Sequence, residues 1–141
     1  MLLISACLLG CACRYDGKSK PHPLAVELAR RGLAVPVCPE QLGGLPTPRK
    51  PSERRGGRVV MADGRDVTAE YRRGAEVTLH LARLYGCTAA VLKERSPSCG
   101  KGQIYDGTFT GTLTAGDGVT AELLTAGGIK VYGESELEKL L

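Results

Sequence analysis

The sequence predicts an α/β protein with a single-domain, three-layer, Rossmann-like fold and a mostly parallel sheet of about four strands. Apolar runs alternate along the chain with segments of helical periodicity, as expected of strands joined by crossover helices. The first run, residues 2–8, is apolar throughout, which is typical of a parallel strand covered on both faces. The chain of 141 residues has the usual size of one domain, so residues 1–141 are treated as one unit.

The first half of the chain contains two strands, two helices and a long loop. After the strand at 2–8, residues 22–32 form a short helix with a proline near its start and Gly32 after its end. Residues 33–38 form the second strand, and the proline- and glycine-rich segment 39–57 is expected to be a loop. A small hairpin turning at Asp63-Gly64 precedes the main helix, for which Asp66 is a good N-cap residue.

The second half continues the alternation. After the main helix at 67–86, the sequence predicts a strand at 87–93, a hairpin at 103–113, a helix at 118–128, a strand at 129–133 and a closing helix at 134–141.

Three cysteines that lie far apart in the sequence follow the predicted strands. Cys7 and Cys38 fall at the carboxyl ends of the first two strands, and Cys99 lies a few residues beyond the third. Ligands of open α/β sheets bind outside these strand ends, so the topology would bring the three thiols to one edge. The apolar start has no basic segment before it and is too short to span a bilayer, which predicts a cytoplasmic protein. In that reducing compartment cysteines are more often metal ligands or catalytic groups than disulfides.

The other cysteines and the two histidines do not complete a zinc signature. Cys87 begins a strand and is expected in the core, whereas Cys11 and Cys13 leave open which thiol of the first loop is used. His22 and His80 are expected to be solvated or to pack. A 4Fe–4S cluster normally takes four cysteines, so three protein thiolates would leave one iron open to water or substrate.

Two polar side chains accompany these thiols. Glu40 stands two residues after Cys38, and a carboxylate beside a metal can deprotonate a water. Ser96 stands three residues before Cys99, where its hydroxyl can hydrogen-bond a substrate. A helix cap or a solvated group is the alternative interpretation of each.

The composition argues against a nucleic-acid partner, because aromatic residues make up only 4% of the chain and there is no Trp. No membrane partner is expected either. The net charge of +4 is a mild excess. Much of it comes from Arg49, Lys50, Arg54, Arg55 and Arg58. We expect these five residues in a solvated loop, and the alternative is a rim that attracts an anionic substrate.

Several long segments resemble one family. They are "SACLLG" followed by "CRYDG", "VCPEQLGGLPTPR", "LKERSPSCG", "IYDGTFTG" and "GDGVTAELL". These motifs are similar to those of the 2-thiouracil desulfidase-like family, formerly known as a domain of unknown function, whose characterised members hold a 4Fe–4S cluster. The likeness runs from about Ser5 to the last helix, nearly the whole chain.

The resemblance implies that Cys7, Cys38 and Cys99 bind the cluster and that Glu40 and Ser96 are the catalytic pair. It implies a desulfidase that removes sulfur hydrolytically from a thiolated pyrimidine base or nucleotide, with no net electron transfer. The open iron would bind the substrate sulfur. One alternative is a metal-binding regulatory or interaction module without catalysis, holding zinc or an iron–sulfur group. A metal-free thiol enzyme with Cys99 as nucleophile is a weaker alternative, because neither histidine has a motif that places it beside this thiol.

Overall fold

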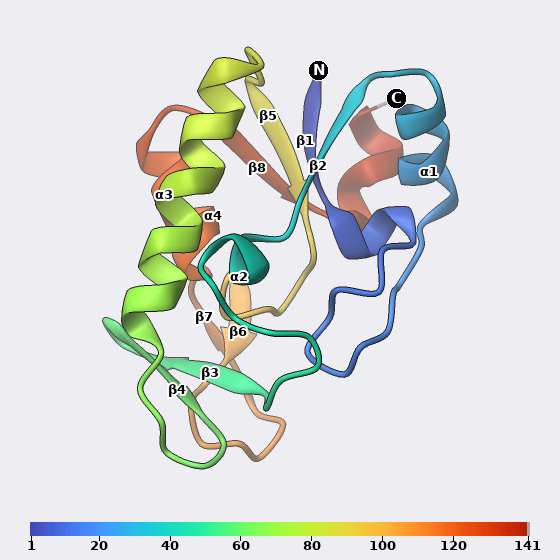
Figure 1. Ribbon diagram of the computed structural model, residues 1–141. Helices are drawn as coiled ribbons and strands as arrows, with labels where there is room; N and C mark the ends of the chain where they lie inside the picture. The colour runs from blue at the N-terminus through green and yellow to red at the C-terminus, as the bar shows by residue number, and fades with distance from the viewer. Residues whose placement is uncertain (141) are drawn as a thin grey trace.

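The computed structural model describes residues 1–140 and has a four-stranded parallel sheet at its centre (Figure 1). The strand order is β2-β1-β5-β8, with bounds Ala34–Val37, Leu2–Ser5, Ala89–Leu92 and Lys130–Gly133. Successive side chains of a strand point to opposite faces, and both faces are covered here. Leu3 and Ile4 of β1 are both 0% exposed and belong to two different clusters of the core.

Helices cover the two faces and make the three predicted layers. The face that contains Leu3 packs against α3 (Thr68–Leu84) and α4 (Val119–Ala126), with Ala82 and Leu124 fully buried between them. The face that contains Ile4 packs against α1 (Pro23–Arg30), the 3-10 turn η1 (Ala6–Leu9) and the closing 3-10 segment η2 (Glu134–Leu140). Figure 1 shows α3 and α4 on one side of the sheet and α1 on the other.

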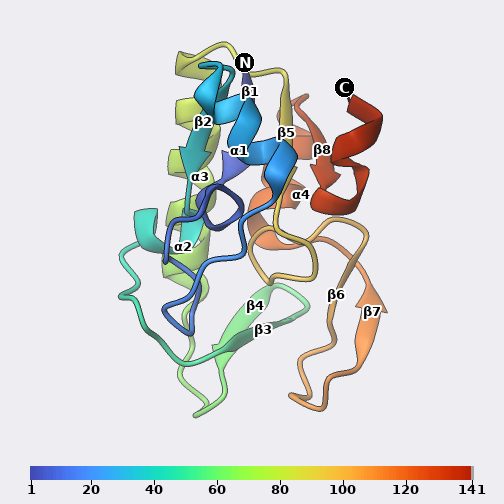
Figure 2. The ribbon, with the colours of Figure 1, turned by 90° about the vertical axis from the view of Figure 1, so that its right-hand side faces the viewer.

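Two antiparallel strand pairs lie below the carboxyl edge of the sheet (Figures 1 and 2). One pair joins β3 (Ser52–Arg55) to β4 (Arg58–Met61), and the other joins β6 (Gln103–Tyr105) to β7 (Leu113–Ala115). The first pair has its own small core, in which Val59 and Met61 pack against Val67 and Tyr71 at the start of α3. The two antiparallel pairs therefore lie beyond the carboxyl ends of the strands of the parallel sheet.

A short helix, α2 (Pro39–Leu42), begins after the single residue Cys38 that follows β2, and its backbone packs against that of α3. Gly43 after α2 and Gly74 within α3 are the contact points. A Cβ on Gly43 would collide with the carbonyl of Glu70, and a Cβ on Gly74 would collide with the carbonyl of Pro39. The close approach therefore requires glycine at both positions.

The α/β class, the parallel sheet and its strands are as the sequence predicts, and several boundaries differ. The first strand ends at Ser5, because the chain enters η1 and a left-handed Gly10 instead of continuing. The proline- and glycine-rich segment 39–57 is not a bare loop, since it contains α2 and β3. The expected hairpin at Asp63-Gly64 is present but minimal, since a single antiparallel bridge joins Val60 to Asp66 across the turn, and β4 has its longer pairing with β3.

The two helical ends also differ from the expectation. The N-cap of α3 is Val67 and not Asp66, which lies one residue earlier and accepts the backbone N–H of Thr68 on its carboxylate at 2.9 Å. The closing helix is a 3-10 segment that ends at Leu140, and residue 141 of the predicted range lies outside the described residues. Among residues 1–140, no helix combines the length and the apolar character needed to cross a bilayer.

Candidate active site

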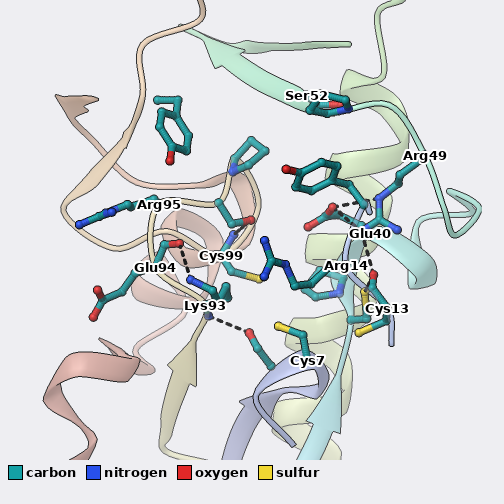
Figure 3. A pocket seen from close by; sticks show the side chains of 18 of the residues that line it. Cys7, Cys13, Arg14, Glu40, Arg49, Ser52, Lys93, Glu94, Arg95 and Cys99 are labelled. Atoms are coloured by element: carbon teal, nitrogen blue, oxygen red, sulfur yellow. Dashed lines mark hydrogen bonds and ion pairs between the residues drawn. The ribbon is translucent and has the colours of Figure 1, made fainter. Parts of the chain in front are cut away.

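A cavity of about 570 Å³ opens at the carboxyl edge of the sheet, within the usual size range of ligand pockets (Figure 3). All five residues singled out in the sequence line it: Cys7, Cys38, Cys99, Glu40 and Ser96. They come from η1, from the β2–α2 junction and from the loop after β5. The parallel topology has thus brought together residues that are up to 92 positions apart in the sequence (99 − 7).

The local backbone explains where each thiol lies. Cys7 is in η1, one residue into the turn that follows β1, and is 7% exposed. Cys38 is the residue between β2 and α2 and is half-buried. Cys99 is 4% exposed and ends a tight turn in which the N–H of Gly100 bonds the carbonyl of Ser96 at 2.8 Å.

A fourth thiol, Cys13, lines the same cavity. It is 5% exposed, and its carbonyl oxygen lies 3.8 Å from the Sγ of Cys38. Figure 3 shows the sulfurs of Cys7, Cys13 and Cys99 directed toward a common space. From the sequence alone, Cys13 is only an alternative to Cys7 as the thiol of the first loop. The spacing of the cysteines does not show that the chain after η1 returns to the cavity.

The surroundings raise the pKa of three of these thiols above its ordinary value. A hydrogen bond to Cys38 lowers the pKa of Cys13, but a hydrogen bond to Cys7 and burial raise it, to about 11 in total. The pKa of Cys38 is raised well above its ordinary value, first by the hydrogen bond to Cys13 and then by burial. Burial and the charge of Glu40 raise the pKa of Cys99 to about 12. Negative charge can therefore collect here only beside a cation.

The thiols surround the cavity rather than meeting at a point. Over residues 1–140, no three His, Cys, Asp or Glu side chains lie close enough to hold a single metal ion. In an iron–sulfur cluster each iron that the protein holds is bound by its own thiolate. Thiols that surround a common space, rather than meeting at one point, are the arrangement that such a cluster requires. The donor type and the burial both fit such a group.

Glu40, in the first turn of α2, is held by a buried arginine. The Nη2 and Nε of Arg49 donate to its Oε2 at 2.7 and 3.1 Å, and the hydroxyl of Tyr71 lies 3.4 Å from the same oxygen. The side chain of Arg49 is only 3% exposed and that of Glu40 15%. The charge pattern predicted that Arg49 is a solvated loop residue, and this is wrong for Arg49. The sequence also gave no indication that Arg49 pairs with Glu40.

Arg49 and Tyr71 are each committed to this corner of the cavity. Arg49 also donates to the carbonyls of Cys13 and Pro46 and to the hydroxyl of Thr47. Burial and the charge of Glu40 raise the pKa of Tyr71 above its ordinary value, so this phenol remains a hydrogen-bond donor. The hydrogen bonds of Arg49 and Tyr71 therefore connect α2, α3 and the loop that contains Cys13.

The hydroxyl of Ser96 accepts two backbone hydrogen bonds, from the N–H groups of Ser98 and Cys99, both at 3.1 Å. Ser96 is therefore a turn cap, the alternative interpretation of its sequence position, and it also lines the cavity. A hydroxyl oxygen that accepts two hydrogen bonds is a stronger donor through its own proton. The two interpretations of Ser96 are thus compatible.

The remaining cysteines and histidines lie elsewhere. Cys87 is 5% exposed within the core and Cys11 is exposed. His22 accepts the N–H of Leu24 as the cap of α1, and His80 is exposed on α3. None of the four is among the residues that line the cavity in the described part of the chain.

Comparison with known proteins gives three matches. The sequence model of a family described as 2-thiouracil desulfurase matches residues 2–136. The uncharacterized protein YbbK of Bacillus subtilis (strain 168) is 44% identical over 151 aligned positions, which span 100% of both chains. A solved structure described as the 4Fe–4S-dependent thiouracil desulfidase TudS superposes with a TM-score of 0.95 at 50% identity, covering 99% of this chain and 93% of that one.

Proposed function

The chain belongs to the 2-thiouracil desulfurase family, and from this premise we propose that it removes sulfur from thiolated pyrimidines with the help of a 4Fe–4S cluster. The observation that supports this most directly is one cavity lined by Cys7, Cys38 and Cys99 together with Glu40 and Ser96. The similar solved structure is described as 4Fe–4S-dependent, and buried thiols are the ligands that such a cluster takes.

Cys7, Cys38 and Cys99 would hold the cluster, because each follows a strand end or a tight turn that fixes its position. Three thiolates leave one iron of four without a protein ligand. Cys13 lines the same cavity and is the alternative thiol of the first loop. When bound, the cluster would supply a Lewis-acidic iron that draws electron density from the substrate sulfur.

The reaction is a hydrolysis whose atoms and electrons balance without a redox partner. A thiocarbonyl and one water give a carbonyl and hydrogen sulfide. Glu40 takes a proton from the attacking water, which then forms the new C–O bond as the C–S bond breaks. The bonds from Arg49 and Tyr71 end on Oε2 of Glu40, which leaves Oε1 as the oxygen available to this water.

Ser96 serves as a hydrogen-bond donor to the reacting group. Its oxygen is already bonded by two N–H groups of its own turn, so its proton is directed away from the loop backbone. The donor and the base thus come from two different strand ends, on loops whose positions the parallel sheet fixes.

The test is anaerobic reconstitution of the protein with iron and sulfide, followed by measurement of sulfide release from 2-thiouracil. We expect about four irons per chain in the wild type, catalytic sulfide release and formation of uracil. The matched controls are Cys99→Ala, which should lose iron and activity, and Cys11→Ala, which should keep both because Cys11 is exposed and outside the cavity.

Two outcomes would contradict parts of the proposal. A protein that holds the cluster and releases no sulfide from thiolated bases or nucleotides would be a metal-binding module without this catalysis. If Cys13→Ala loses iron while Cys7→Ala keeps it, the cluster is held by Cys13 in place of Cys7.

A further inference from the structure

The loop between β6 and β7, residues 106–112, presents an aromatic ring to the cavity from a rare backbone conformation. Phe109 has φ +58, in the left-handed region that bulky residues avoid at a cost of about 1–2 kcal/mol. Its side chain is half-buried and lines the same cavity as the thiols. Backbone strain of this kind persists only where the surroundings fix it, and it occurs often at ligand clamps.

A buried carboxylate fixes this loop. Glu53 of β3 is 8% exposed, and its Oε1 accepts the N–H of Gly107 at 2.9 Å and the N–H of Phe109 at 3.1 Å. Gly107 has φ +92, and a Cβ there would collide with the side chain of Arg55. Asp106 adds a bond to the N–H of Thr108 at 2.9 Å. The loop therefore has one well-defined shape before any ligand binds.

Arg55 supports the ring from outside the cavity. Its guanidinium carbon lies 5.9 Å from the centroid of the Phe109 ring, a cation–π distance. Its Nε donates to the carbonyl of Gly107 at 2.7 Å. Phe109 is among the residues that line the cavity and Arg55 is not.

We propose that Phe109 is the stacking platform for the pyrimidine ring of the substrate and that Glu53 is its positioning residue. The inference rests on the proposed function for the identity of the substrate. Every pyrimidine has a flat π face, and an aromatic side chain that is already immobilised can stack on it with little loss of side-chain entropy. Stacking on a ring face leaves the in-plane sulfur free to point toward the thiols and Glu40.

Three tyrosines line the same cavity, and two of them are used differently. Tyr71 is 2% exposed and its hydroxyl contacts Glu40. Tyr15 is 42% exposed, and the guanidinium of Arg14 lies over the Tyr15 ring. Tyr105, on β6, is the remaining rival, but its backbone lies in a regular strand pair, Tyr105↔Leu113, rather than in the left-handed region.

The experiment compares reconstituted wild type with Phe109→Leu, which keeps an apolar side chain without a π face. We expect Phe109→Leu to bind uracil about 5- to 20-fold more weakly by calorimetry and to raise the KM for 2-thiouracil by a similar factor. Phe109→Tyr, which keeps the ring, should stay within about 3-fold of wild type. With 5,6-dihydro-2-thiouracil, whose ring is not aromatic, wild type and Phe109→Leu should differ by less than about 3-fold.

The positioning of the ring has its own pair of variants. Glu53→Ala removes the acceptor of both loop N–H groups and should reproduce the rise in KM, with kcat changed less than KM. Glu53→Gln keeps an oxygen acceptor at the same place and should restore the KM. Iron content and melting temperature are measured for every variant, so that a simple loss of folding is recognised.

The outcomes separate this inference from the proposed function. If folded Phe109→Leu binds uracil as tightly as wild type, or if Tyr105→Leu weakens binding instead, Phe109 is not the platform. An equal rise in KM for the aromatic and the dihydro substrate would also overturn the inference, because it would indicate a general effect on the cavity. A wild type that binds uracil but releases no sulfide contradicts the proposed function, while the binding ratio still decides the stacking.

Discussion

Removal of the Arg49 guanidinium should destabilise the protein strongly, because it would leave a mostly buried carboxylate without its cation. Arg49→Met removes both bonds to Glu40 and the bond to the carbonyl of Cys13. Breaking a buried ion pair by removing one partner costs about 3–5 kcal/mol. Since the Glu40 side chain keeps 15% of its exposure, we expect the lower end, about 3 kcal/mol. Arg49→Lys keeps the charge and loses the fork of donors, and should cost about 1–2 kcal/mol.

The assay is equilibrium urea unfolding of the cluster-free protein under reducing, anaerobic conditions. A shift of the midpoint with an unchanged slope reports a change in stability alone. The double variant Glu40→Gln/Arg49→Met completes a cycle, and its loss should be smaller than the sum of the single losses by about 1–3 kcal/mol. On reconstituted protein, Arg49→Lys should lower kcat more than it raises KM, because Glu40 loses its fixed orientation.

Two results would refute this reasoning. Additive losses in the cycle would mean that Arg49 and Glu40 do not act as a pair. If the Arg49 variants keep their stability and raise the KM only for a phosphorylated substrate, the result would instead support the alternative that Arg49 belongs to a rim that attracts an anionic substrate. The geometry favours the pair, because Arg49 is 3% exposed and all its donors point to groups of the protein.

Three further outcomes are expected. Glu40→Gln should keep its iron and lower kcat by about 10²–10⁴-fold, and a wild-type rate would exclude Glu40 as the base. Cys99→Ser should lose iron, whereas Cys87→Ala should keep it and lose about 1 kcal/mol of stability from a small cavity in the core, both measured by iron assay and unfolding. Gly74→Ala should force α2 away from α3, lowering the unfolding free energy by about 1–3 kcal/mol together with kcat. Its control, Gly57→Ala, meets no atom within 4 Å and should leave both unchanged.

The sheet and the thiols at its edge were predictable because local sequence determines them. Continuous apolar runs mark the buried parallel strands, and the topology then places whatever follows each strand at one edge. Cys7, Cys38 and Cys99 lie there for this reason, and Glu40 and Ser96 lie there because they are two and three residues from a thiol. Their assignment as ligands and catalytic pair stays a prediction until iron and turnover are measured in variants.

The partners of these residues were not predictable, because they depend on long-range packing. Arg49 looks like one of several loop cations until the chain is folded, and only then does it meet Glu40 nine positions earlier. Glu53 and Phe109 are 56 positions apart and meet only because the β3–β4 and β6–β7 pairs lie side by side (Figure 2). A signal was present in the second case, since a single Phe within a glycine-flanked turn is an unusual use of a bulky residue.

The position of the proposed base depends on a backbone contact remote from the chemistry. Glu40 belongs to a four-residue helix, which is too short to hold its own orientation in water. What fixes it is the seating of α2 on α3 at Gly43 and Gly74, where any Cβ would strike a carbonyl. The same close approach brings Tyr71 of α3 to the carboxylate, and Arg49 then closes the remaining side. The two glycines therefore determine the position of the Glu40 carboxylate relative to the thiols, although neither glycine has a side chain that could contact the substrate.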